Sequence, residues 1–164
     1  MKFVSIIIGS KSDYDVMIEC ANTLDKFGVL HELIISSAHR SPERTHGYIQ
    51  GAEERGCRVF ICAAGMAAHL AGVVASLTTK PIIGVPMKGG VMDGMDALLS
   101  TVQMPSGMPV ATVAVGKAGA TNAAYLAMQI LSLEDNDLQV KLQEDRILKA
   151  KKVESDSLDI EIRL

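Results

Sequence analysis

Short runs of apolar residues alternate along the chain with longer segments in which apolar positions recur every three or four residues. The short runs are typical of strands buried on both faces, and the longer spacing is typical of amphipathic helices. The short runs predict strands at residues 3–8, 33–36, 58–63, 81–85 and 110–115. The longer segments predict helices at residues 13–27, 42–55, 67–77, 96–103, 118–131 and 135–152, followed by a polar tail over the last dozen residues.

Glycine, serine and proline mark several of these boundaries. Gly28 follows the first predicted helix, where glycine commonly ends a helix. Ser41 and Pro42 stand at the N-cap and the first position of the second helix, and Gly56 follows its end. Pro86 is expected to close the fourth strand.

The strict alternation of strand and helix predicts parallel pairing with right-handed crossovers. We therefore expect a three-layer, doubly wound α/β sheet of about five parallel strands, of the flavodoxin-like class. A chain of 164 residues suits a single domain. Here that domain, 1–164, ends in a charged helix and tail from about residue 135.

Composition and charge exclude several classes of protein. Hydrophobic residues make up 48% of the chain, so a disordered chain is excluded. The net charge of −3 and the 4% of aromatic residues argue against a nucleic-acid partner. The most apolar stretch, residues 59–77, includes glycines and a histidine, so no membrane span is expected. Cys20, Cys57 and Cys62 are interpreted as buried free thiols, which fits a cytoplasmic protein.

Two of the predicted helices carry too few polar residues for an exposed surface. Residues 67–77 and residues 120–131 are rich in alanine and other apolar residues. A helix on the surface of a monomer needs a polar face. The sequence therefore predicts a homo-oligomer that covers these helices.

Candidate chemistry is sought at the carboxyl ends of the strands, where open parallel sheets bind ligands. After the first strand, Ser10 and Ser12 bring hydroxyl groups to a helix N-terminus, which favours an anion. Asp13 either caps the helix or accepts ribose hydroxyls. A plain N-cap turn is an equally good interpretation of this segment.

The segment after the second strand contains Ser37, Ala38, His39 and Arg40. Arg40 can bind a phosphate through its planar fork of donors. His39, in the same loop, is the candidate acid–base residue.

The segment after the third strand is made of small residues. Gly65, Ala67 and Ala68 allow a ligand ring to approach the backbone. His69 falls inside the predicted apolar helix, as either a buried, hydrogen-bonded histidine or a catalytic one. A further loop at residues 103–109, rich in proline and glycine, is expected to wall the pocket.

No cluster of residues in the sequence has metal-ligand spacing, and no Walker or G-x-S-x-G motif is present. We therefore expect chemistry that uses one histidine and a phosphate clamp, with no cofactor and no metal.

Six segments of the chain, in the same order, strongly resemble segments of the catalytic subunit of phosphoribosylaminoimidazole carboxylase, the PurE type. They are Gly9–Asp13, Ser37–Arg40, Ala64–Leu70, Ile83–Pro86, Leu98–Pro105 and Gly116–Ala120. The resemblance covers roughly residues 3 to 133. Relatives commonly have glycine where Met66 stands and proline where Ala71 stands.

The resemblance implies an isomerase of purine (IMP) biosynthesis that moves a carboxylate from N5 to C4 of an aminoimidazole ribonucleotide. It implies no cofactor, a small-molecule ribonucleotide substrate, a homo-octamer, and a link to the ATP-dependent carboxyaminoimidazole ribonucleotide synthase. His39 matches the proton-transfer residue of the family. Ser10, Asp13 and Arg40 match its nucleotide-binding positions, and His69 lies near its active site.

Three rival functions remain. A related branch carboxylates the ribonucleotide directly with CO2, but it tends to have lysine at the position of Arg40 and Ser-Asn-Ala at residues 67–69. A non-catalytic nucleotide-binding oligomer is the rival from another class, and His39 argues against it. A flavin carrier is disfavoured by the absence of tryptophan.

Overall fold

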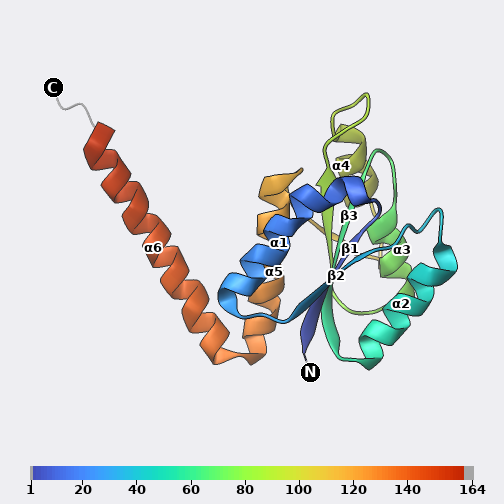
Figure 1. The fold of residues 1–164 in the computed structure, drawn as a ribbon, viewed down its shortest axis with the longest axis horizontal. Coiled ribbons are helices and arrows are strands. Elements are labelled where there is room, and N and C mark those ends of the chain that lie inside the picture. The colour runs from blue at the N-terminus through green and yellow to red at the C-terminus, as the bar shows by residue number, and fades with distance from the viewer. Residues whose placement is uncertain (1, 161–164) are drawn as a thin grey trace. The chain divides into compact units, whose positions relative to one another are not determined.

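The computed structural model describes residues 2–160. It contains two compact units, one that ends at Met128 and one that begins at Gln129. The first unit contains a sheet of five strands in the order β2-β1-β3-β4-β5, and every neighbouring pair is parallel (Figure 1). The strands are β1 (Phe3–Ile8), β2 (His31–Ile35), β3 (Cys57–Gly65), β4 (Ile82–Met87) and β5 (Ala111–Thr112). This arrangement is the predicted flavodoxin-like α/β fold.

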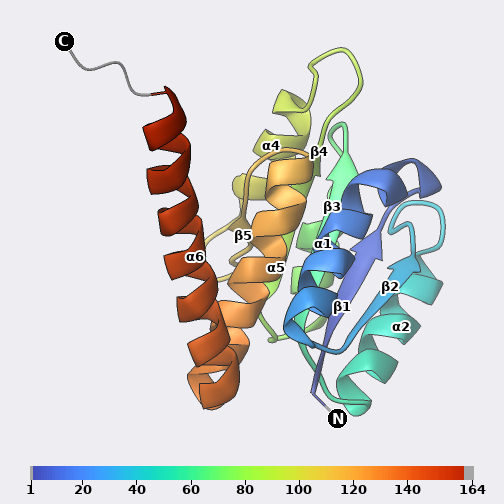
Figure 2. The same ribbon diagram turned by 60° about the vertical axis from the view of Figure 1, so that its left-hand side comes forward.

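Helices cover both faces of this sheet. Figures 1 and 2 show α1 and α5 on one face and α2 and α3 on the other. The helices of the first unit are α1 (Tyr14–Phe27), α2 (Pro42–Glu54), α3 (Leu70–Leu77), α4 (Met95–Val102) and α5 (Lys117–Leu131), the last of which runs on past Met128. A short 3-10 helix, η1 (Lys11–Asp13), precedes α1.

Alternate residues of the strands supply the core on the two faces, because successive side chains of a strand point to opposite sides. Ile7, Phe60 and Cys62 pack into one buried cluster with residues of α2 and α3. Ile6 and Ile61, each one position away, are also fully buried. The apolar composition of the strands is therefore explained by burial on both faces.

The predicted element boundaries differ from the observed ones at several points. Pro86 lies within β4 instead of ending it, paired with Ala64 of β3. Its carbonyl accepts a hydrogen bond from Gly116 on the β5 side. The missing N–H of Pro86 would point to the same side as this carbonyl. Strand β5 has already ended at Thr112 on that side, so the sheet loses no hydrogen bond. Helix α3 begins at Leu70, so His69 precedes the helix instead of lying inside it.

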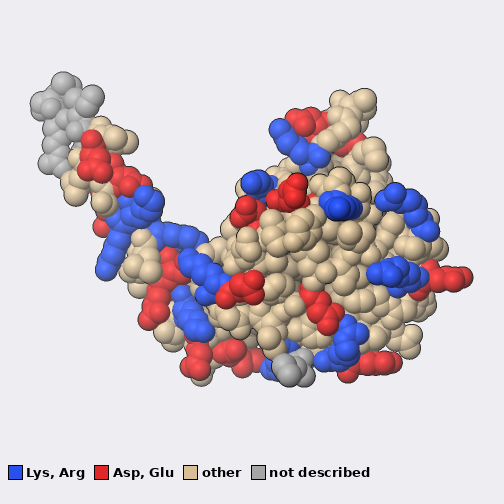
Figure 3. Space-filling view, viewed as in Figure 1, with Lys and Arg blue, Asp and Glu red and all other residues tan. Residues whose placement is uncertain are grey.

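The second unit contains a short 3-10 helix, η2 (Ser132–Glu134), and the long helix α6 (Asn136–Ile160). Helix α6 carries charges of both signs along its length (Figure 3). The Lys149 ammonium lies 2.8 Å from the Asp145 carboxylate, and that of Lys152 lies 3.0 Å from Asp156. The predicted polar tail is wrong over residues 153–160, which continue α6, and the pair between Lys152 and Asp156 stabilises this extension. The last four residues of the predicted tail, 161–164, lie outside the described part of the chain.

Within residues 2–160, no helix has both the length and the apolar character that crossing a membrane requires.

Helix α5 packs closely on the segment that follows β5, and on β4, because Gly119 has no side chain. A Cβ atom at Gly119 would overlap the carbonyl oxygen of Ala114 and would lie 3.2 Å from Val85 Cγ1. A backbone carbonyl cannot move aside as a flexible side chain can. We therefore expect Gly119→Ala to lower the free energy of unfolding by about 3 kcal/mol or more, the cost of severe overpacking.

Urea denaturation measures this effect, and Gly47→Ala is the matched control. Gly47 is exposed in α2, and an added Cβ there meets nothing within 4 Å. Alanine at position 47 should raise the free energy of unfolding by about 0.5–1 kcal/mol, because glycine weakens a helix interior. Equal denaturation midpoints for the two variants would contradict the close approach at Gly119.

Candidate active site

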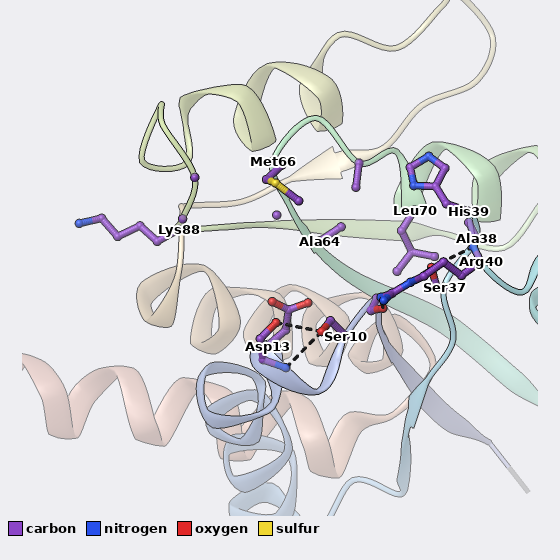
Figure 4. Close-up of a pocket in the computed structure, with 16 residues that line it drawn as sticks. Ser10, Asp13, Ser37, Ala38, His39, Arg40, Ala64, Met66, Leu70 and Lys88 are labelled. Atoms are coloured by element: carbon purple, nitrogen blue, oxygen red, sulfur yellow. Dashed lines mark hydrogen bonds between the residues drawn. The ribbon is translucent and has the colours of Figure 1, made fainter.

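A cavity of about 660 Å³ opens at the carboxyl edge of the sheet (Figure 4). Four segments line it, one after each of the strands β1, β2, β3 and β4. The lining residues are Gly9, Ser10, Ser12, Asp13, Ser37, Ala38, His39, Arg40, Ala64, Gly65, Met66, Ala68, Leu70, Lys88, Gly89 and Gly90. The structure thus brings together most of the residues that the sequence selected from separate strand ends.

The segment after β1 folds into a capped turn. Ser10 is the N-cap of η1, and its hydroxyl accepts hydrogen bonds from the Ser12 amide at 3.3 Å and the Ser12 hydroxyl at 3.0 Å. The Asp13 amide donates to the Ser10 carbonyl at 3.2 Å. Ser10 therefore caps the short turn, whereas the Asp13 side chain makes no capping bond to α1, and the Ser10 and Ser12 hydroxyls lie on the wall of the cavity.

Asp13 is half-buried beside these hydroxyls, and this burial raises the pKa of its carboxyl group. Hydrogen bonds from the Ser12 side chain and the Ser10 backbone oppose the rise, because they stabilise the ionised form. Figure 4 shows the Asp13 carboxylate directed toward the cavity. An ionised acceptor for hydroxyl groups is thus held in a partly desolvated place.

Arg40 joins the first two lining segments. One terminal NH2 group of its guanidinium donates to the Gly9 carbonyl at 3.2 Å, and its Nε donates to the Ser37 hydroxyl at 3.4 Å. The backbone amide of Arg40 also donates to that hydroxyl at 3.2 Å. Ser37 therefore fixes the turn, and the turn places His39 and Arg40 at the rim of the cavity, where both are exposed.

The segment after β3 contributes Gly65, Met66 and Ala68 to the cavity, whereas Ala67 and His69 do not line it. The His69 Nδ1 atom donates to the carbonyl of Ser100 in α4 at 2.8 Å, since a carbonyl can only accept. The Ser100 hydroxyl in turn donates to the Ala68 carbonyl at 3.2 Å. These two bonds tie the segment to α4, which is the role of a hydrogen-bonded structural histidine.

Sequence reasoning missed Lys88, Gly89 and Gly90, which directly follow β4. The same selection of strand ends applies to them, because β4 continues past Pro86 to Met87. Lys88 is exposed and pairs with Asp93 at 3.1 Å.

The loop at residues 103–109 was expected to wall the pocket, but none of its residues lines this cavity within the chain. Its residues 107–109 line a separate cavity of about 880 Å³, together with residues that precede and begin β4. The loop leads into β5, and a segment before a parallel strand lies at the amino edge of the sheet, away from the strand ends.

The three cysteines are free and buried, as predicted. Burial raises the pKa of Cys20 to about 12 and that of Cys57 to about 11, and it also raises the pKa of Cys62. These thiols stay protonated at neutral pH and are poor nucleophiles. Within residues 2–160, no three side chains of His, Cys, Asp or Glu are grouped to hold a metal ion.

The lining groups favour an anionic ligand that also carries hydroxyl groups. Arg40 and Lys88 supply positive charge, Ser10 and Ser12 supply hydroxyl groups at a helix N-terminus, and His39 supplies an imidazole. Small residues after β3 leave room for a flat ring against the backbone.

Comparison with known proteins identifies the family of the chain. A family model described as AIR carboxylase matches residues 3–152. The N5-carboxyaminoimidazole ribonucleotide mutase of Pyrococcus horikoshii is 54% identical over 85% of this chain and 78% of its own length. The mutase of the same description from Bacillus subtilis is 52% identical over 87% of this chain and 88% of its own length.

Solved structures give the same relationship. The crystal structure of Treponema denticola PurE matches with a TM-score of 0.89 and 28% identity, over 99% of this chain and 100% of that one.

The raised pKa of Asp13 yields a prediction about stability. A folded pKa above the unfolded value means that ionising Asp13 costs the folded state free energy, fully so above the folded pKa. Asp13→Asn should therefore raise the free energy of unfolding at pH 7, by about 0.5–1 kcal/mol.

The advantage of asparagine should shrink as pH falls through the folded pKa toward 3.8, where the wild-type carboxyl is neutral in both states. Urea midpoints at pH 7 and pH 4.5 test this expectation. An Asp13→Asn variant that is less stable than wild type at pH 7 would show that the hydrogen bonds outweigh the burial.

Proposed function

The chain belongs to the AIR carboxylase family, and on this premise we propose that it is an N5-carboxyaminoimidazole ribonucleotide mutase of purine biosynthesis. The observation that carries the proposal is the convergence of His39, Arg40 and the Ser10–Asp13 turn on one cavity. Curated relatives that are about half identical to this chain are named as mutases, which supports the same activity.

The ribonucleotide binds along the cavity with its 5′-phosphate at the turn after β1. The Ser10 and Ser12 hydroxyls and the Arg40 guanidinium donate to the phosphate oxygens, and the Asp13 carboxylate accepts from ribose hydroxyls. Arg40 already reaches the Gly9 carbonyl of that turn, which supports this placement.

The aminoimidazole ring lies against the small residues after β3. Gly65 and Ala68 line the cavity, and Ala67 continues the same backbone between Met66 and Ala68. Ser37 and Ala38 wall the ring on the side of β2.

His69 holds this surface through its bond to the Ser100 carbonyl and, as the family resemblance implies, lies beside the bound substrate. Lys88 also lines the cavity, where its charge favours the anionic ribonucleotide.

The reaction proceeds by loss and recapture of CO2. The bond between N5 and the carboxyl carbon breaks, CO2 leaves, and N5 takes a proton to become an amine. C4 then attacks CO2, forms the new carbon–carbon bond and loses its own proton. His39 donates the first proton and accepts the second, so the reaction needs no net proton. Holding CO2 beside C4 replaces a bimolecular encounter with a unimolecular step.

We also propose that the chain assembles into a homo-octamer in the cytoplasm and takes its substrate from an ATP-dependent carboxyaminoimidazole ribonucleotide synthase. The chain itself buries five of the eight residues of α3 and six of the fifteen of α5, so the apolar composition of α3 does not by itself require a partner. Support for assembly comes from large apolar side chains around α4 that are about half exposed or more. They are Val91, Met92, Met95, Leu99 and Val102. Exposed apolar side chains gathered in one stretch of the chain favour contact with another subunit.

Conversion of N5-carboxyaminoimidazole ribonucleotide to its C4-carboxylated isomer, followed by ultraviolet absorbance, tests the function. We expect His39→Asn to bind the ribonucleotide with near-normal affinity, since asparagine keeps a donor at the rim. Turnover should fall by roughly 10²–10⁴-fold, the usual contribution of a positioned acid–base group. Wild type should also remove deuterium from C4 at a rate comparable with turnover, and the variant should not.

Arg40→Ala is the matched variant in the neighbouring position. It should raise KM, because a charge-assisted phosphate contact contributes about 2–3 kcal/mol to binding.

Turnover that depends on added bicarbonate would favour direct carboxylation instead. Ligand binding by wild type with no turnover would leave only a nucleotide-binding oligomer.

The assembly is tested by sedimentation. We expect wild type at micromolar concentration to sediment as a species of several chains, and Leu99→Glu to sediment as a smaller species. The added carboxylate would be buried without a partner in the proposed contact. A stable, folded wild-type monomer would rule out the octamer.

A further inference from the structure

Met66 has a backbone conformation that its residue type disfavours. Its φ angle is +53°, in the left-handed region where a residue with a Cβ atom is strained. Glycine would adopt this conformation without cost. Its side chain is 63% exposed, so burial in the core does not offset the strain. Strain that the core does not explain, at a residue lining the candidate site, calls for a functional explanation.

The side chain of Met66 extends from the loop after β3 toward the loop after β4. A Cβ atom added to Gly90 would lie 3.3 Å from Met66 Cγ, tighter than an ordinary contact. Gly90 itself has a φ of +69°, so the β4 loop presents bare backbone where the thioether arrives. Figure 4 shows Met66 and Lys88 on the same side of the cavity, opposite Ser10 and Asp13.

The geometry points to Met66 as a positioning residue that covers the cavity mouth and retains the CO2 released during the reaction. This inference rests on the proposed mutase function. CO2 is small, uncharged and apolar, so neither Arg40 nor Lys88 can hold it by charge. A flexible, polarisable methionine side chain suits this task, because it fits an irregular gap and still allows substrate entry.

The cover acts on one branch point of the reaction. Once the bond from N5 to the carboxyl carbon is broken and N5 is protonated, CO2 has two fates. It either forms a bond to C4, whose proton passes to His39, or it escapes and leaves free aminoimidazole ribonucleotide. A side chain over the mouth slows escape without changing bond formation, so its removal changes the ratio of the two products.

Met66→Gly tests this role by removing the cover and the strain together. We expect a melting temperature close to that of wild type, because relief of the left-handed strain and the greater freedom of glycine in the unfolded chain oppose each other. With N5-carboxy-¹⁴C-labelled substrate, the ratio of free aminoimidazole ribonucleotide to C4-carboxylated product should rise roughly tenfold, equivalent to about 1.4 kcal/mol. The KM for substrate should change little, since Met66 makes no polar contact with it.

Two controls make the result specific. Met66→Leu keeps an apolar cover of similar size and should retain the wild-type ratio. Met108→Gly removes another methionine, one that lines the separate cavity at residues 107–109, and should also leave the ratio unchanged. A Met66→Gly enzyme that turns over with the wild-type ratio would overturn the role of Met66 and leave the mutase function standing. A wild-type protein without turnover would instead overturn the function, and this inference with it.

Discussion

Parallel pairing of the strands is the constraint on which the site depends. It carries every strand end to one edge of the sheet, so loops that are distant in sequence meet there. The hydrogen bond from Arg40 to the Gly9 carbonyl joins two such loops across 31 residues of sequence. It forms because β2 lies beside β1, with Ile35 opposite Ile8 at the last paired position. Without that register, the cation and the hydroxyl-bearing turn would not share a cavity.

The order and type of the elements could be predicted from the sequence because periodicity reports burial directly. Strand β1, buried at all six positions, and helix α1, with a single apolar face, illustrate this. Boundaries were less predictable where tertiary contacts decide them. His69 precedes α3 because its ring bonds to Ser100 of α4, a partner that lies 31 residues away. Strand β5 spans only Ala111–Thr112, shorter than the predicted run 110–115, and pairs with β4 at two positions.

The candidate site was predictable to the extent that residue type signals chemistry. Arg40, His39 and the serine turn were selected from their strand ends, and all of them line the cavity. Gly89 and Gly90 have no side chains that could indicate chemistry, and only the fold shows that they line the cavity. Met66 could be selected as unusual from family resemblance, yet its positive φ and its proximity to Gly90 come from the structure alone.

The site and the core obtain their properties from different residues. Core stability depends on close approaches such as that of Gly119 to Ala114, where no added atom fits. The cavity instead contains groups in unfavourable states, a half-buried carboxyl at Asp13 and a left-handed backbone at Met66. These two residues lie on loops after different strands, so each cost can persist without disturbing the paired strands beneath. A rigid parallel sheet therefore allows its edge to hold strained and desolvated groups that an isolated loop could not keep in place.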